Sequence, residues 1–506
     1  MNQPPVKQVA TPEPASGAGS PALKRNAIGV PGIVFFVVAA AAPLAAALGA
    51  SPMGFMALGV GAPGAYVIAG LVLILFAVGY GSMSRFVTSS AGFAAYLELG
   101  LGRVAGFAGA AVALLAYNCM LMGLYGVFGF FASAVIGDLT GVETDWKLWT
   151  ALAWVGVAVL GYLEINLSAK VLGVLMICEV LILVIFDGAV LVQGGASGIN
   201  LDSFQPGNVF SDGLGVALLF AAASFVGFEA TAIYGEEAKD PARTIPRATY
   251  VAVVLIAVFY ALSTWAISLA HGSEQIQQAA TDDPSGFVFA VNTQYVGQWS
   301  TTIMNVLLVT STFAVLVAFH NTLSRYMFAL GRSGVLPRTV GVTHPRWQSP
   351  HRASVTVTGL TLIVVGTFMV AGADPFTQLY AWLVGVGTVG VLVMQAATSV
   401  AVMVFFLRKK RAEFRLWSGA IAPILAALGL TAATYLALAN WDILAGATSG
   451  IPTLLPWLVV LAAIVGVAGA WATRRTRTSL TSSFDDNDKG KTLPLVSGAV
   501  APAPHN

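Results

Sequence analysis

Charged side chains are scarce in this sequence. Of its 506 residues only 9% are Asp, Glu, Lys or Arg, and 57% are hydrophobic. A soluble domain carries about 25% charged residues, so this composition excludes an ordinary soluble protein. It indicates a helical membrane protein with many spans, and the 54 glycines and 23 prolines fit because membrane helices tolerate both.

Cysteine and catalytic motifs are also nearly absent. The two cysteines, Cys119 and Cys178, lie inside apolar runs, which argues against a disulfide framework or a thiolate metal site. The chain has no His-Glu-x-x-His, Walker lysine or nucleophile elbow. We therefore expect no enzyme, no metal and no cofactor. Residues 1–25 lack the apolar core of a signal peptide, so we predict that this segment and 476–506 are disordered cytoplasmic tails.

Long apolar segments fill the rest of the chain. A membrane span needs about 20 apolar residues. Twelve segments meet this rule, at 28–50, 63–86, 104–136, 147–166, 170–192, 213–234, 248–270, 299–329, 353–372, 377–407, 418–439 and 452–473. The sequence thus predicts an all-α integral membrane protein with a twelve-helix domain over residues 26–475.

The positive charges predict the orientation of this domain. If the N-terminus lies in the cytoplasm, only Lys147 of the 25 Lys and Arg residues falls in an external segment. Lys and Arg concentrate in the cytoplasmic loops of membrane proteins. We therefore predict a multi-pass protein of the cytoplasmic membrane, with both termini in the cytoplasm.

Two spans are interrupted near their middle. Span 1 contains Pro43 after a run of alanines, and proline breaks a helix because it lacks an N–H and its ring clashes with the preceding turn. Span 6 loosens at 224–227, Ser-Phe-Val-Gly. These spans open two blocks of five helices, 26–193 and 212–410, with helices 11 and 12 at 415–475. Five is odd, so the second block is inverted, and matching breaks in inverted repeats indicate a transporter's substrate site.

Several motifs resemble one known family. They are Gly-Phe-Glu at 227–229, the loop residues 236–241 and 244–247, the segment 80–102, and the segment 321–337. As a set they resemble the amino acid/polyamine/organocation (APC) superfamily, of the bacterial amino acid permease type. The resemblance implies a LeuT-like five-plus-five inverted repeat with broken helices 1 and 6, amino acid or amine substrates, and secondary transport. Many relatives break helix 1 with glycines, whereas here the break is Ala-Ala-Pro43.

The two breaks form the predicted substrate site. Backbone N–H groups at about 45–48 would receive a carboxylate, and carbonyls at 223–226 an ammonium. The predicted substrate-binding residues are Ala41, Ala42, Pro43, Ala45, Ala46, Asn118, Ala223, Ser224, Phe225, Val226, Gly227 and Phe228. The alternatives are a plain kink at Pro43, an interhelical hydrogen bond at Asn118, and lipid-facing filler at Phe225 and Phe228.

Three ionisable residues are candidates for proton coupling. Glu179 lies mid-span, where burial disfavours the charged form, and in proton-coupled relatives a titratable residue of helix 5, a lysine, replaces bound sodium. Glu229 is either a proton-linked gate or a brace that closes a freed N–H of span 6. His320 either joins a proton path or bonds a neighbouring helix. A structural role for Glu179 stays open.

Other polar and aromatic residues receive simpler interpretations. We expect Asp187, late in span 5, to reach water, and Tyr380 and Trp382 to lie in the interfacial aromatic belt or at an outer gate. The predicted function is secondary active transport of an amino acid or amine by alternating access, with a proton as the coupling ion. Alternatives are sodium coupling, exchange, polyamine import and, from another class, a non-transporting sensor. We expect no nucleic-acid partner.

Overall fold

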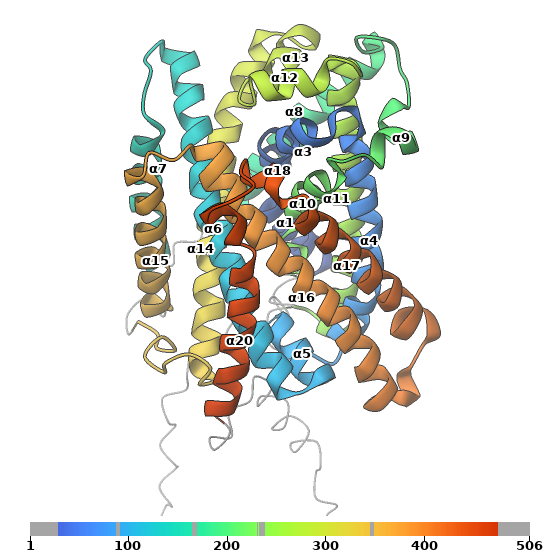
Figure 1. Cartoon of the computed structure of the whole chain (residues 1–506), viewed down its shortest axis with the longest axis vertical. Helices are drawn as coiled ribbons and strands as arrows, with labels where there is room; N and C mark the ends of the chain where they lie inside the picture. The colour runs from blue at the N-terminus through green and yellow to red at the C-terminus, as the bar shows by residue number, and fades with distance from the viewer. Residues whose placement is uncertain are drawn as a thin grey trace, which may run out of the picture.

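The computed structural model describes residues 29–87, 92–163, 169–229, 231, 238–344 and 349–473. The regular structure of these residues is helical, and the helices form a tall bundle (Figure 1). Nine of the described helical segments are long and apolar enough to cross a membrane: Pro43–Phe86, Arg103–Thr140, Trp146–Leu163, Gly173–Gln193, Ala242–His271, Gln298–Arg332, His351–Val370, Pro375–Arg408 and Trp417–Ala439. The all-helical architecture with several membrane-spanning helices is confirmed. The predicted tails and the pair Glu236-Glu237 lie outside the described residues.

The predicted number of twelve spans is not established by this count. Two apolar helices fall short of spanning length, α10 (Leu214–Phe225) and α20 (Trp457–Ala472), and α1 (Val30–Ala41) is also short. Within Pro43–Phe86 the chain turns at Gly59, whose φ of 56° ends the helix. Helix breaks therefore shorten some of the predicted spans, and elsewhere parts of two predicted spans fall in one helical segment. Twelve spans in an inverted repeat remain a prediction.

The first break follows α1. Proline disfavours the α conformation in the residue before it, and Ala42 leaves the helix with φ 42° and ψ 77°. The chain resumes as α2 (Pro43–Ala45), a π-helical turn η1 (Ala46–Ala50) and α3 (Ser51–Leu58). The predicted interruption at Pro43 is therefore present as a real break rather than a smooth kink.

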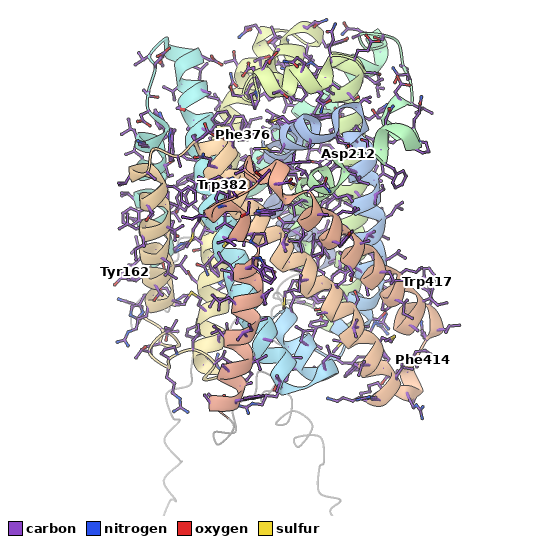
Figure 2. All side chains as sticks on the ribbon, in the orientation of Figure 1. Tyr162, Asp212, Phe376, Trp382, Phe414 and Trp417 are labelled. Carbon is purple, nitrogen blue, oxygen red and sulfur yellow. The ribbon has the colours of Figure 1, made fainter. Side chains whose placement is uncertain are left out.

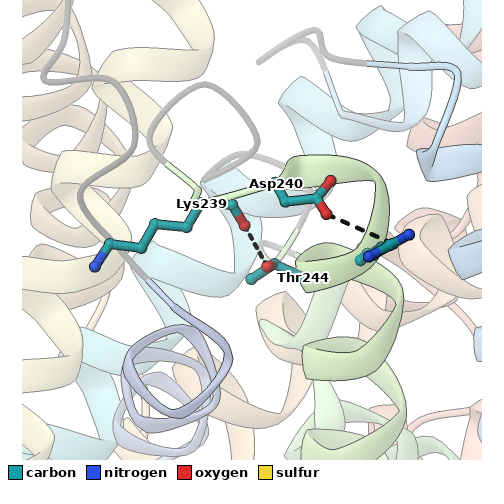
Figure 3. Close-up of polar contacts among 4 residues, drawn as sticks. Lys239, Asp240 and Thr244 are labelled. Carbon is teal, nitrogen blue, oxygen red and sulfur yellow. Dashed lines mark hydrogen bonds and ion pairs between the residues drawn. The ribbon is translucent and has the colours of Figure 1, made fainter.

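The second break follows α10. Val226 is extended, and Gly227 adopts φ 117°, which a residue with a side chain rarely does. Residues 228, 229 and 231 follow, the description resumes at Ala238, and α11 (Pro241–His271) then begins. Figure 3 shows this start: the Thr244 hydroxyl donates to the Lys239 carbonyl, and Asp240 forms an exposed ion pair of 3.6 Å with Arg243. Pro241 at the first helical position fits, because its missing N–H would have no partner there.

The long helix α6 packs mainly against α5, α14, α16 and α20 and also contacts α7 and α15, while α4 lies along α11. The remaining described elements are α4 (Ala62–Ser84), α5 (Phe93–Leu101), α6 (Arg103–Thr140), α7 (Trp146–Leu163), α8 (Ala169–Gln193), α9 (Pro206–Val209), α12 (Ile276–Asp282), α13 (Phe287–Tyr295), α14 (Gln298–Arg332), α15 (His351–Val370), α16 (Ala381–Arg408), α17 (Ala422–Ala439), α18 (Trp441–Ala445), α19 (Ile451–Leu454), the 3-10 turns η2 (Gly59–Gly61), η3 (Asp202–Phe204) and η6 (Arg411–Glu413), and the π turns η5 (Pro375–Tyr380) and η7 (Trp417–Ile421).

The two ends of the bundle differ. The short helices α12 and α13 cover one end, and α5 lies near the other (Figure 1). α12 packs on α3, where the Gln277 amide donates to the Met56 carbonyl at 3.0 Å. On the sides, large apolar residues point outward: Leu152 is 55% exposed on α7, and Trp417 is 53% exposed at the outer edge of the bundle (Figure 2). Such a surface suits contact with lipid.

Candidate functional site

Tyr260 of α11 contacts both helix breaks. Its hydroxyl donates to the carbonyl of Ala41, the last residue of α1, at 2.9 Å. Its ring meets that of Phe225, the last residue of α10, at 5.5 Å. Tyr66 of α4 lies edge-on to Tyr260 at 6.2 Å and shares a hydrogen bond of 3.3 Å with Ser224. The predicted proximity of the two breaks is therefore present.

The backbone donors of the first break differ from the prediction. The Ala46 N–H bonds the Ala42 carbonyl at 3.0 Å, so it is not free to receive a carboxylate. A π-helical turn then spans Ala46–Ala50, and the Ser51 N–H bonds the Ala46 carbonyl, so the backbone after the break stays hydrogen-bonded. The N–H of Leu44, one residue after Pro43, instead interacts with the Glu179 carboxyl. The donor that we expected at Ala46 thus lies nearer Pro43.

The second break is packed on all sides. The Ala223 carbonyl, an expected ammonium ligand, accepts the Val226 N–H at 3.1 Å. Phe225 and Phe228 are both 0% exposed, which contradicts a lipid-facing role. Phe228 meets Phe76 of α4 edge-on at 5.9 Å. Phe225 therefore packs on Tyr260 of α11, and Phe228 packs on Phe76 of α4.

Glu229 has a complete set of hydrogen-bond partners. Its Oε1 accepts the Tyr117 hydroxyl at 2.8 Å, and its Oε2 accepts the Gly227 N–H at 3.0 Å. Its backbone carbonyl accepts the Tyr80 hydroxyl at 3.1 Å. A small cavity lined in part by these tyrosines and Tyr326 of α14 adjoins the carboxyl. Glu229 accepts the hydrogen bond of the Gly227 N–H, which the break leaves without a helical partner. This geometry fits the structural alternative given for Glu229 above.

Glu179 is partnered differently. It is 4% exposed on α8 and interacts with the Ser311 hydroxyl of α14 and with the Leu44 N–H at the first break. Its Oε2 is buried without a hydrogen-bond partner. An intramembrane carboxyl costs about 2.5–3.5 kcal/mol when charged and marks a functional site by default. Glu179 therefore joins the broken helix, α8 and α14 through a carboxyl with one open oxygen.

The remaining predicted polar residues have partners of their own. The Asn118 amide donates to Leu114 of its own helix at 2.7 Å, so this bond is not interhelical, and its Oδ1 is buried without a partner. His320 Nε2 bonds the Ser354 hydroxyl of α15 at 2.9 Å. That contact is the interhelical hydrogen bond that the sequence leaves open as the alternative to a proton path.

The expectation of an interfacial belt is wrong for Tyr380. Tyr380 is 4% exposed and stacks on Phe376 at 5.5 Å, with Phe220 of α10 at 5.8 Å, so its ring packs inside the protein rather than against lipid. Figure 2 labels Phe376 and the neighbouring Trp382, whose indole N–H is buried without a partner. Asp187 is partly exposed, while its Oδ1 is buried without a partner and its Oδ2 accepts the Ser263 hydroxyl at 2.7 Å.

Sequence reasoning missed the hydroxyl groups around the carboxyls. The predicted site does not include Ser311, Tyr80, Tyr117 or Tyr260. A buried polar residue in an apolar span is the one available signal, and it does not tell which helix the residue faces. Among the residues that the structure describes, no three His, Cys, Asp or Glu side chains gather as metal ligands.

Comparison with known proteins agrees with this architecture. The branched-chain amino acid permease BcaP of Bacillus subtilis is 26% identical over 371 residues, which are 69% of this chain and 74% of the relative. The methylthioribose transporter of Bacillus subtilis is 25% identical over 381 residues, 72% of this chain and 77% of the relative. The low-affinity putrescine importer PlaP of Escherichia coli K12 is 23% identical over 320 residues, 60% of this chain and 66% of the relative.

The family model described as amino acid permease matches residues 28–467, which is most of the chain. This match includes both breaks and both carboxyls of the candidate site. The relatives are transporters of small molecules rather than enzymes. The chain is therefore a multi-pass membrane transporter and belongs to the amino acid permease family of the APC superfamily.

Proposed function

We propose that this protein is a secondary active transporter that carries an amino acid across the cytoplasmic membrane together with a proton. The observation that carries the proposal is Glu179, a buried carboxyl that interacts with the Leu44 N–H at the first break and leaves Oε2 open. A carboxyl in this position can hold a proton in one state of helix 1 and release it in another. Twelve spans in an inverted repeat, with both termini cytoplasmic, complete the proposal.

The substrate site lies between the two breaks. The Leu44 N–H interacts with Glu179, so a substrate carboxylate would compete with that carboxyl for donors at the start of α2. Protonation of Glu179 weakens its hold on Leu44 and favours substrate binding, which couples the two ligands. The name of the relative BcaP supports a neutral, branched-chain amino acid as the first substrate to test.

The test is uptake by purified protein in liposomes. Labelled leucine, isoleucine and valine lead a panel that also contains arginine and putrescine, each under an imposed pH or sodium gradient. We expect leucine or a similar amino acid to accumulate under the pH gradient alone. Accumulation driven only by sodium would contradict proton coupling. Exchange without accumulation, or uptake of putrescine alone, would favour the exchanger or the polyamine importer, and no transport would favour a sensor.

A further inference from the structure

A second carboxyl, which is partly exposed, lies on the same helix as Glu179. Asp187 and Glu179 are eight residues apart on α8, which is about 12 Å along the helix axis. α8 ends at Gln193, whose amide donates to the Tyr295 carbonyl of α13 at 2.8 Å. Asp187 is therefore closer than Glu179 to the end of the bundle that α12 and α13 cover (Figure 1).

The carboxyl of Asp187 has one partner and one open oxygen. Its Oδ2 accepts the Ser263 hydroxyl of α11 at 2.7 Å, and its Oδ1 is buried without a partner. A brace needs both oxygens bonded, as in Glu229. A single neutral hydroxyl partner leaves the other oxygen of Asp187 as an acceptor at which a proton can bind.

No cation balances this carboxyl within the described helices around it. α8 packs against α1, α2, α11, α13 and α14. α1, α2 and the part of α14 before His320 contain no titratable side chain. On α11 the nearest titratable groups are Tyr260 and His271, and His271 instead bonds the Phe287 carbonyl at 3.0 Å. α13 contributes only Tyr295.

Hydroxyl groups lie between the two carboxyls. Ser263, the partner of Asp187, stands one turn from Tyr260 on the same face of α11. Tyr260 bonds Ala41 at the first break and lies close enough to Glu179 for an electrostatic interaction. Along α11, the hydroxyls of Ser263 and Tyr260 therefore lie between the position of Asp187 and the position of Glu179.

We propose that Asp187 is a proton relay, which takes a proton from the side covered by α12 and α13 and passes it to Glu179. The O–H bond formed at Asp187 breaks when the proton moves on, so Asp187 returns to its starting state in each cycle. This inference rests on the proposed proton-coupled function. The inference goes beyond that function because it assigns proton entry and coupling to separate residues.

The test compares Asp187→Asn with Ser263→Ala and Glu179→Gln in proteoliposomes under a pH gradient. Asparagine keeps an oxygen for the Ser263 hydroxyl but cannot carry the proton. We expect Asp187→Asn to slow the initial rate of driven uptake about tenfold or more, to raise the solvent deuterium isotope effect on that rate, and to leave the final accumulation and the exchange at equal pH unchanged. Ser263→Ala keeps the carboxyl and should retain most of the rate. Glu179→Gln should abolish accumulation.

Three results would overturn the relay while the wild type still responds to the pH gradient. An unchanged initial rate in Asp187→Asn would leave Asp187 as a structural partner of Ser263. A lower final accumulation would make it a coupling site instead. If Asp187→Asn also lost exchange at equal pH, and Asp187→Glu did not restore it, Asp187 would have a role in folding. If the wild type itself ignores the pH gradient, the proposed function fails first and the relay falls with it.

Discussion

Glu229 and Glu179 lie beside the two helix breaks and differ in how their oxygens are bonded. Both oxygens of Glu229 accept hydrogen bonds, from Tyr117 and from the Gly227 N–H. Glu179 interacts with Ser311 and Leu44 and keeps Oε2 without a partner. A buried acceptor with all its donors stabilises one conformation, whereas an open oxygen leaves a place for a proton. This difference is the basis for proposing a structural role for Glu229 and a coupling role for Glu179.

The largest expected effect separates the two residues by function. Glu179→Gln should abolish accumulation of the labelled amino acid under a pH gradient, because the amide cannot bind and release the proton. Exchange at equal pH should continue, since the helix breaks stay intact. The measurement is uptake and counterflow in the same liposomes. A Glu179→Gln protein that still concentrates substrate would remove Glu179 from the coupling step.

The next largest effect is the difference in stability between variants of Glu229 and of Glu179. Glu229→Ala leaves the Tyr117 hydroxyl and the Gly227 N–H buried without an acceptor, which costs about 1–3 kcal/mol for each group. Glu179→Gln should cost much less, because a neutral amide retains an acceptor for Ser311 and Leu44. Thermal unfolding in detergent measures both. The assignment is reversed if the substitution at Glu179 is the more destabilising one.

A smaller effect sharpens the comparison of the breaks themselves. Gly227 has φ 117°, and Gly227→Ala should destabilise the protein by about 1–3 kcal/mol of backbone strain. Ala42 has φ 42°, and Ala42→Gly should change stability by less than about 1 kcal/mol, because relief of strain is offset by the entropy of glycine. The same unfolding assay applies. Equal effects at both sites would show that the two breaks carry similar strain.

The smallest expected effect concerns the residue that touches both breaks. Tyr260→Phe removes the hydrogen bond to Ala41 and keeps the ring contact with Phe225. An interhelical hydrogen bond in a membrane protein contributes about 0.6 kcal/mol. Unfolding should therefore shift only slightly, and Tyr260→Ala, which also loses the ring, should shift it further. Identical shifts would mean that the ring contributes nothing.

The sequence predicts the breaks better than it predicts their surroundings. Pro43 and Gly227 act on their own backbone, so local rules suffice to find them. Ser311 and Tyr117 reach Glu179 and Glu229 from distant helices, and no sequence spacing brings these pairs together. The burial of Tyr380 was not predicted for a related reason. The sequence around it does not indicate which side of the helix faces inward.

The hydrogen bond from Tyr260 to Ala41 has a consequence for the proposed order of events in transport. The last carbonyl of α1 is bonded by a phenol, a group that does not titrate at physiological pH. The segment after the break interacts at Leu44 with Glu179, the residue proposed to carry the proton. Under this proposal a proton loosens the segment after the break while α1 stays anchored. The two segments of the broken helix would then be released under different conditions, which opposes simultaneous opening on both sides of the membrane.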